Sequence, residues 1–218
     1  MVRNGWLVPL MVLALVGIAP APRAAAEDQT SPEQASRFVQ DLGSQTVTLL
    51  TRYHDGDARQ LQRRLQDLIR EGFDLDMISR FALGATWQTA TPAQRQEYQA
   101  LFAAWTAESY AHRLGADKGG NLTVIGAQPA ADQLGPDATD AIVHTRLNRP
   151  NEASIDADLR VRDSEGRMKI VDVSMDGVSL DVTQRDEFAS VIRRKGLAGL
   201  IRELKARTDT LPVDTARQ

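Results

Sequence analysis

The sequence has no cysteine, few aromatic residues and, after its first two dozen positions, no long apolar run. A chain without cysteine forms no disulfides, offers no thiolate nucleophile and cannot carry a lipid anchor on an N-terminal cysteine. Its stability must come from burying apolar surface, and 218 residues suffice for one substantial core. We therefore expect a single domain.

An excess of basic residues is also missing. The chain has 26 Lys and Arg against 29 Asp and Glu, which gives a formal net charge of −3. Proteins that bind nucleic acids cluster Lys and Arg on one face, and those that bind single strands stack bases on aromatic rings. With an aromatic content of 5%, the composition predicts no nucleic-acid partner.

The side-chain patterns of common enzymes and metal sites are missing too. The histidines, His54, His112 and His144, fall on different predicted elements and show no paired spacing with carboxylates, as a metal site would require. No serine lies in a Gly-x-Ser-x-Gly turn, and Gly119-Gly120 precedes a predicted strand rather than a helix. We expect no enzymatic activity, no metal and no cofactor.

What is present begins with an export signal. Arg3 is followed by an apolar run over 6–18 and by the small residues Ala24-Ala25-Ala26, the layout of a secretory signal peptide. We place this segment at residues 1–26 and the mature start at Glu27. The alternative is an uncleaved anchor, for which the run is short. The remaining chain is expected to be soluble in the periplasm.

Helices are predicted first. A cap and proline at 31–34 start a helix that ends at 54–57, and a second helix follows. A short helix covers 73–83 and stops at Gly84. The capping pattern returns at 91–94 and starts the longest helix, which ends near Gly115.

Strands come next and one helix closes the chain. Strict alternation over 153–162 predicts a half-buried antiparallel strand, in which Asp156 and Asp158 form a surface charge ladder with the neighbouring arginines. The other expected strands cover 122–125, 141–147 and 168–175, with a loop over 126–139 and turns at 163–166 and 176–177. A last helix starts at the cap Thr183, is kinked at Gly196 and leaves a disordered tail at 208–218.

This order of elements predicts the fold class. Helices, then strands, then one helix favour an α+β fold with an antiparallel sheet of about four strands, rather than alternating βαβ units. The domain is expected to cover residues 27–207.

Three stretches carry a family resemblance. They are residues 73–84 with Trp87, residues 91–102, and residues 171–180 followed by 185–188 and 196–200. Together and in this order they resemble the MlaC or toluene-tolerance family of periplasmic lipid-binding proteins, including its hopanoid-associated HpnM branch.

The resemblance implies both a fold and a function. It implies a curved cystatin-like or nuclear-transport-factor-like sheet against helices, with a deep apolar cavity for a phospholipid or a hopanoid-type lipid. It also implies a monomeric carrier that shuttles lipid between an inner-membrane ABC transporter complex and an outer-membrane lipoprotein complex, which maintains outer-membrane lipid asymmetry. Met168 and Val171 stand where the family usually has tryptophan and tyrosine, so the identity of the lipid stays open.

The candidate lipid-binding residues are apolar side chains of the helices and of the strands. Each of them alone is more often part of a solid core, and only the resemblance makes the set a cavity wall. Arg80, Tyr110 and Arg113 are possible headgroup contacts, but each also fits an ordinary surface position. The wall residues are Phe73, Met77, Ile78, Phe81, Trp87, Tyr98, Phe102, Trp105, Val143, Ile155, Leu159, Val171, Val173 and Met175.

Two other classes of function stay open at this point. A hydrolase or isomerase on the same scaffold would need acidic or basic groups inside the cavity, which the strand alternation does not place there. A structural adaptor of an envelope complex would have a filled core and a partner surface, for example on the exposed arginines of the second helix.

Overall fold

The computed structural model describes residues 30–53, 58–116, 120–130, 140–148, 153–164 and 166–210. The predicted signal peptide (1–26), the turn at 54–57 and most of the expected tail lie outside these residues. Within the described residues, no helix combines the length and the apolar character needed to span a bilayer.

The two helices with predicted capping patterns start as expected, although the second of them, at 25 residues, is shorter than the 31-residue last helix. Helix α1 (Pro32–Arg52) follows Ser31, whose hydroxyl accepts the N–H of Gln34. Helix α5 (Pro92–Ala116) follows Thr91, which exchanges two hydrogen bonds with Gln94, so the predicted capping box is confirmed. Helix α2 (Ala58–Gly72) lies between them in the chain.

The predicted helix over 73–83 starts later than expected. Phe73 forms a parallel β-bridge with Ile170, and helix α3 (Leu75–Leu83) is capped by Asp74, which accepts the N–H of Met77 at 2.9 Å. A backbone hydrogen bond from Asp74 to the Ile170 carbonyl secures this crossing to the sheet. Gly84, at φ 59°, ends α3, and the short helix α4 (Thr86–Thr89) follows.

The sheet confirms the predicted α+β class and has one more short strand than expected. Its five strands are antiparallel and follow the chain order. They are β1 (Asn121–Pro129), β2 (Ala141–Asn148), β3 (Ile155–Ser164), β4 (Arg167–Met175) and β5 (Val178–Ser179).

The prediction of a loop from Gly126 onward was wrong for its first four residues. Strand β1 continues to Pro129, which lies opposite Ala141, and a register shift between Val124 and Gly126 marks a bulge. A bulge accepts glycine, and an edge strand tolerates proline because it has an unpaired side. Residues that normally indicate a loop therefore fit here within a strand.

The last helix also starts earlier than the predicted cap at Thr183. Helix α6 (Leu180–Thr210) begins after Ser179, whose hydroxyl accepts the N–H of Val182 at 3.1 Å. The predicted kink at Gly196 is confirmed, with φ 68° and ψ 174°. Because α6 reaches Thr210, residues 208–210 are helical rather than part of a tail.

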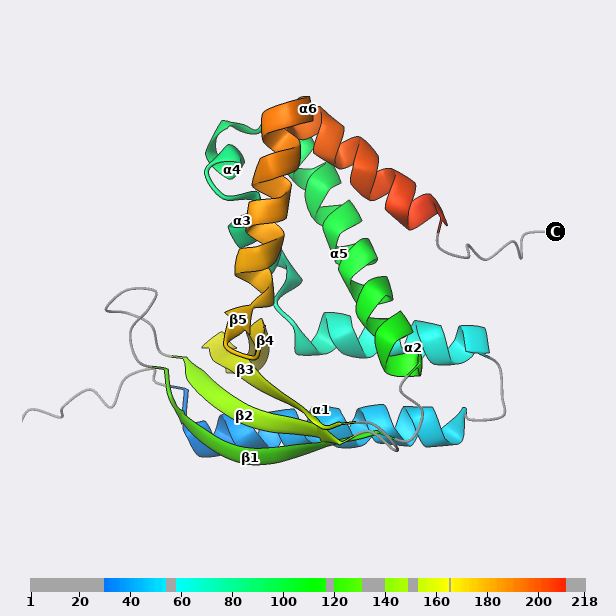
Figure 1. Ribbon diagram of the computed structural model, residues 1–218, viewed down its shortest axis with the longest axis vertical. Helices are drawn as coiled ribbons and strands as arrows, with labels where there is room; N and C mark the ends of the chain where they lie inside the picture. Colours follow the sequence, from blue (N-terminus) through cyan, green and yellow to red (C-terminus); the bar gives the residue numbers. More distant parts are fainter. Residues whose placement is uncertain are drawn as a thin grey trace, which may run out of the picture.

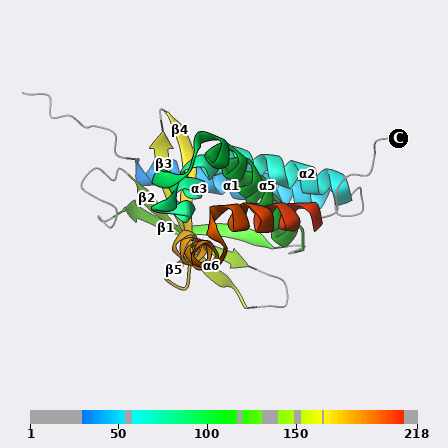
Figure 2. The same ribbon diagram turned by 90° about the horizontal axis from the view of Figure 1, so that it is seen from above.

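The elements form two packed regions (Figures 1 and 2). Helix α1 lies along β1 and β2, and α2 connects it to α5. Helices α3, α5 and α6 pack on one another farther from the sheet, and the kink gives α6 two arms. We call the apolar core of this second region the helical cluster; its buried residues are Leu75, Ile78, Ala82, Leu83, Tyr98, Phe102, Phe188, Leu200, Ile201 and Leu204.

Candidate functional site

A hollow of about 530 Å³ lies between α1 and the inner face of the sheet. We call it the apolar cavity. Helix α1 lines it with Val39, Leu42, Gly43, Thr46, Val47 and Leu50, and the sheet with Leu122, Thr145, Leu147, Ile155, Ala157, Leu159, Ile170, Val173 and Met175. Ile69, Phe73, Tyr110, Gly120 and Leu180 complete the wall.

Several of the residues that line the cavity are small, among them Gly43, Thr145 and Ala157. In the sheet, Ala157 lies opposite both Thr145 on β2 and Met175 on β4. Gly43 lets α1 approach β1 closely, since a Cβ at this position would lie 3.3 Å from Leu122. The Thr145 hydroxyl donates to the Ala157 carbonyl at 2.7 Å, so it presents no unsatisfied donor to the cavity.

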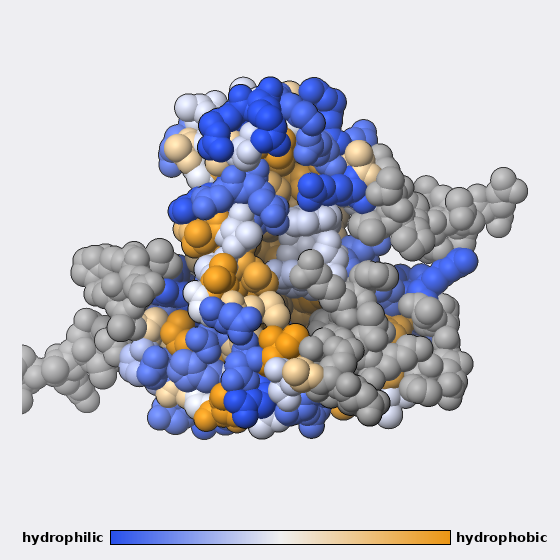
Figure 3. All heavy atoms as spheres, in the orientation of Figure 1, coloured by the Kyte–Doolittle hydropathy of each residue, from blue (hydrophilic) through white to orange (hydrophobic). Residues whose placement is uncertain are grey.

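The cavity wall is apolar in character. No charged side chain of the described residues lines it. The space-filling view shows apolar atoms gathered near the middle of the molecule, beside a hollowed part of the surface (Figure 3). Concave, mainly apolar hollows of about 300–1,000 Å³ are the usual form of sites for small apolar ligands.

Charged groups of the sheet lie on its other face. Arg146 binds Asp156 through two hydrogen bonds of 2.7 and 2.8 Å, and His144 Nδ1 lies 2.7 Å from the Asp158 carboxylate. Asp156 and Asp158 thus carry charges on a sheet face as predicted, but their partners are Arg146 and His144 on β2. The neighbouring Arg160 and Arg162, which were expected in the ladder, bind the buried Asp140 instead. Among the described residues, no three His, Asp or Glu side chains converge as a cation site.

Phe73 lies where three hollows meet. It lines the apolar cavity, a polar pocket of about 330 Å³ at the surface, and a third hollow beside α6. Its ring packs against Tyr110, with ring centroids 5.7 Å apart. The β-bridge to Ile170 fixes its backbone at the place where the three hollows adjoin.

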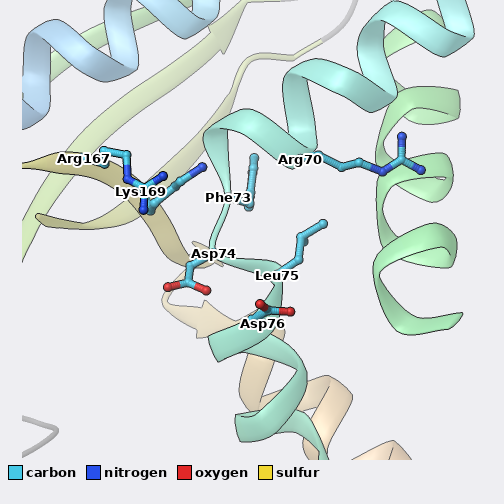
Figure 4. A pocket seen from close by; sticks show the side chains of 7 residues that line it. All are labelled: Arg70, Phe73, Asp74, Leu75, Asp76, Arg167 and Lys169. Carbon is cyan, nitrogen blue, oxygen red and sulfur yellow. The ribbon is translucent and has the colours of Figure 1, made fainter. Parts of the chain in front are cut away.

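The polar pocket has mixed charges that do not converge (Figure 4). Arg167 and Lys169 lie together on β4, whereas Arg70 extends away from them. Lys169 donates to the Glu71 carbonyl, and Asp74 caps α3. Lys169 and Asp74 thus hold neighbouring elements in place, and we assign the pocket no function.

Five of the predicted wall residues line the apolar cavity. They are Phe73, Ile155, Leu159, Val173 and Met175. Val143 and Val171 are buried in the sheet region without lining it.

The other predicted wall residues belong to the helical region. Ile78, Tyr98 and Phe102 are buried in the helical cluster, against which Trp87 and Trp105 pack. Phe81 and Trp87 also lie under guanidinium groups, and Met77 Sδ accepts a hydrogen bond from Arg162. The structure thus separates most of the predicted aromatic residues from the cavity.

The wall formed by α1 was missed. The stripe that includes Val39, Leu42 and Leu50 predicts a helix face. Nothing in this stripe shows that a gap separates part of the face from the sheet on which it packs. Gly43 and Thr46 carry no apolar signal at all. Their place in the wall depends on how α1 packs on the sheet, where Gly43 lies against Leu122.

Comparison with known proteins agrees with this architecture. The family model described as MlaC protein matches residues 44–206. The solved structure of a phospholipid-binding protein from Ralstonia solanacearum, in complex with a phospholipid, is similar with a TM-score of 0.67 and 25% identity, covering 80% of this chain and 97% of that one. Since the family model spans most of the sequence, the chain belongs to the MlaC family.

Proposed function

We propose that this protein is a periplasmic carrier that binds a phospholipid by enclosing acyl-chain carbons in the apolar cavity. The observation that carries the proposal is the hollow of about 530 Å³ with an uncharged wall. Family membership and the phospholipid complex of the similar Ralstonia protein support it.

The volume is suited to about one acyl chain. A methylene group occupies about the space of a water molecule, roughly 30 Å³, so the cavity holds on the order of 18 carbons. A second chain would need the cavity to widen or would lie partly outside it. A hopanoid-type lipid is the alternative ligand within the same function.

The energetics favour an enclosed site. Transfer of a hydrocarbon chain out of a bilayer costs about 0.8 kcal/mol per methylene, or roughly 13 kcal/mol for 16 carbons. Only a wall that covers most of the chain replaces the bilayer, and α1 and the sheet line the cavity from two sides. An uncharged wall also supports binding without turnover, whereas the open hollow argues against an adaptor with a filled core.

Family membership also supports a proposal for the route of the lipid. We propose that the carrier passes lipid between an inner-membrane ABC transporter complex and an outer-membrane lipoprotein complex, after export by the signal-like segment at residues 1–26.

Native mass spectrometry tests the binding step. The full chain is mixed with vesicles of phosphatidylethanolamine and phosphatidylglycerol, separated from them, and measured for bound lipid. We expect a one-to-one complex, and Val173→Asp in the cavity wall should lower the bound fraction by more than about tenfold. Val178→Asp is the matched control, since Val178 is exposed on the neighbouring strand.

Two results would contradict the proposal. One is a wild-type protein that stays free of lipid under these conditions. The other is a folded Val173→Asp variant that binds as much lipid as Val178→Asp.

A further inference from the structure

A second hollow of about 320 Å³ adjoins the apolar cavity. We call it the side pocket; it lies between α5, β4 and the start of α6. The two hollows share Phe73, Tyr110, Val173 and Leu180. The two hollows therefore lie next to each other, with these side chains in the wall of both.

The side pocket contains the buried side chain of Asp181. Asp181 is 9% exposed, and within the described residues no hydrogen bond or ion pair to its carboxylate is present. Burial, and then the charge of Asp172, raise the pKa of Asp181 to about 8. Burying a carboxylate destabilises the folded state unless a cation pairs with it or several donors form hydrogen bonds to it.

Asp172 has a different role in the same pocket. Its Oδ1 accepts the Ser179 hydroxyl at 2.9 Å and the backbone N–H of Asp181 at 3.4 Å. Asp172 thus holds the start of α6 and, with it, the position of Asp181. The Asp181 side chain itself has no hydrogen-bond donor among the described residues and is available to a ligand.

A second, independent observation comes from α5. Thr106 also lines the side pocket and is 5% exposed, and its hydroxyl has no hydrogen-bond partner among the described residues. Buried hydroxyls are normally satisfied. An acceptor on α5 and a carboxylate on α6 therefore line the same small space.

A positive group lies at the same pocket. The Arg207 guanidinium sits over the Trp105 ring, 5.7 Å from its centroid, and both residues line the side pocket. A ligand that carries a cation and an anion a few bonds apart would match a pocket with this distribution of charge.

We propose that the side pocket binds the primary ammonium of an ethanolamine-type phospholipid headgroup, with Asp181 and Thr106 as acceptors and Arg207 facing the phosphate. This inference rests on the proposed carrier function. The ammonium has three donors to distribute between the carboxylate and the hydroxyl. An anionic headgroup would instead bring negative charge to Asp181, Asp172 and Glu187.

Competition between two lipids with identical acyl chains tests the headgroup site. The full chain is equilibrated with vesicles of equal parts phosphatidylethanolamine and phosphatidylglycerol, and the extracted lipid is quantified. We expect wild type to prefer phosphatidylethanolamine by about tenfold, the size of one charge-assisted hydrogen bond. Asp181→Asn should abolish most of this preference while total bound lipid stays constant.

Two further variants keep the test sharp. Thr106→Val removes the hydroxyl at nearly constant shape and should reduce the preference by a smaller factor. Asp186→Asn, on an exposed carboxylate of the same helix, is the matched control and should leave the preference unchanged.

The outcomes separate the two proposals. Equal uptake of both lipids by wild type, or an unchanged preference in folded Asp181→Asn, overturns the headgroup site and leaves the carrier function standing. Uptake of neither lipid contradicts both. Tight, Asp181-dependent binding of chain-free glycerophosphoethanolamine would show that the pocket serves a soluble amine, which also overturns the proposal.

Discussion

The middle of the helical cluster is filled by aromatic rings, although Ile78 and Phe102 also border the side pocket, whereas the region between α1 and the sheet contains the apolar cavity. In the cluster, Tyr98, Phe102 and Phe188 stack mutually with ring centroids 5.8–6.2 Å apart. The apolar cavity is lined mostly by aliphatic and small side chains, and Phe73 and Tyr110 are the aromatic residues in its wall. The size of facing side chains, more than their hydrophobicity, separates a core from a binding site.

The largest effect is expected from emptying the filled region. Phe102→Ala removes a ring that is 2% exposed and should lower the free energy of unfolding by about 3–5 kcal/mol. Leu159→Ala in the cavity wall should cost about 2 kcal/mol, since its neighbours already border a void. Urea denaturation of both variants measures the difference; equal losses would contradict the contrast.

Asp181 allows a pH-dependent comparison between the two regions. Because its folded pKa, about 8, lies above its unfolded value of 3.8, the folded state binds more protons between these values and stability falls as pH rises through this window. Asp181→Asn should therefore gain on the order of a few kcal/mol over wild type between about pH 4.5 and 8.5. The Asp186→Asn variant should show no such gain, and a parallel pH profile for wild type and Asp181→Asn would refute the assignment.

Replacing a small residue with a large one should have different effects in the helical cluster and in the apolar cavity. Ala82→Phe in the helical cluster should destabilise the protein by about 1–3 kcal/mol, because its surroundings are full. Ala157→Phe should fill the apolar cavity at little cost in stability and displace lipid. Thermal unfolding and native mass spectrometry give the two readouts, and retention of wild-type lipid binding by Ala157→Phe would place the ligand elsewhere.

The smallest effect concerns the hydroxyl in the cavity wall. Thr145→Val removes the hydrogen bond to the Ala157 carbonyl and should cost about 1 kcal/mol or less. Lipid binding should persist, because the wall becomes more apolar. A large loss of stability would show that this bond holds β2 to β3 more strongly than the strand pairing indicates.

The candidate site was only partly predictable from the sequence. Strand residues such as Leu159 and Val173 could be predicted, because side chains alternate between the two faces of a strand and the apolar ones mark the inner face. Phe102 and Tyr98 were chosen for their size, yet large rings interlock with one another and fill their region. Asp181 carried no signal, since its isolation depends on the residues that surround it after folding.

The sequence by itself determined the capped starts of α1 and α5, the alternation of β3, the kink at Gly196 and the family, because these depend on neighbours along the chain. The tertiary structure alone decided which apolar faces meet and which stand apart. A hollow is a property of two facing surfaces and of the distance between them. The apolar cavity depends on residues of α1, β3 and β4 together, and no single one of these residues predicts it.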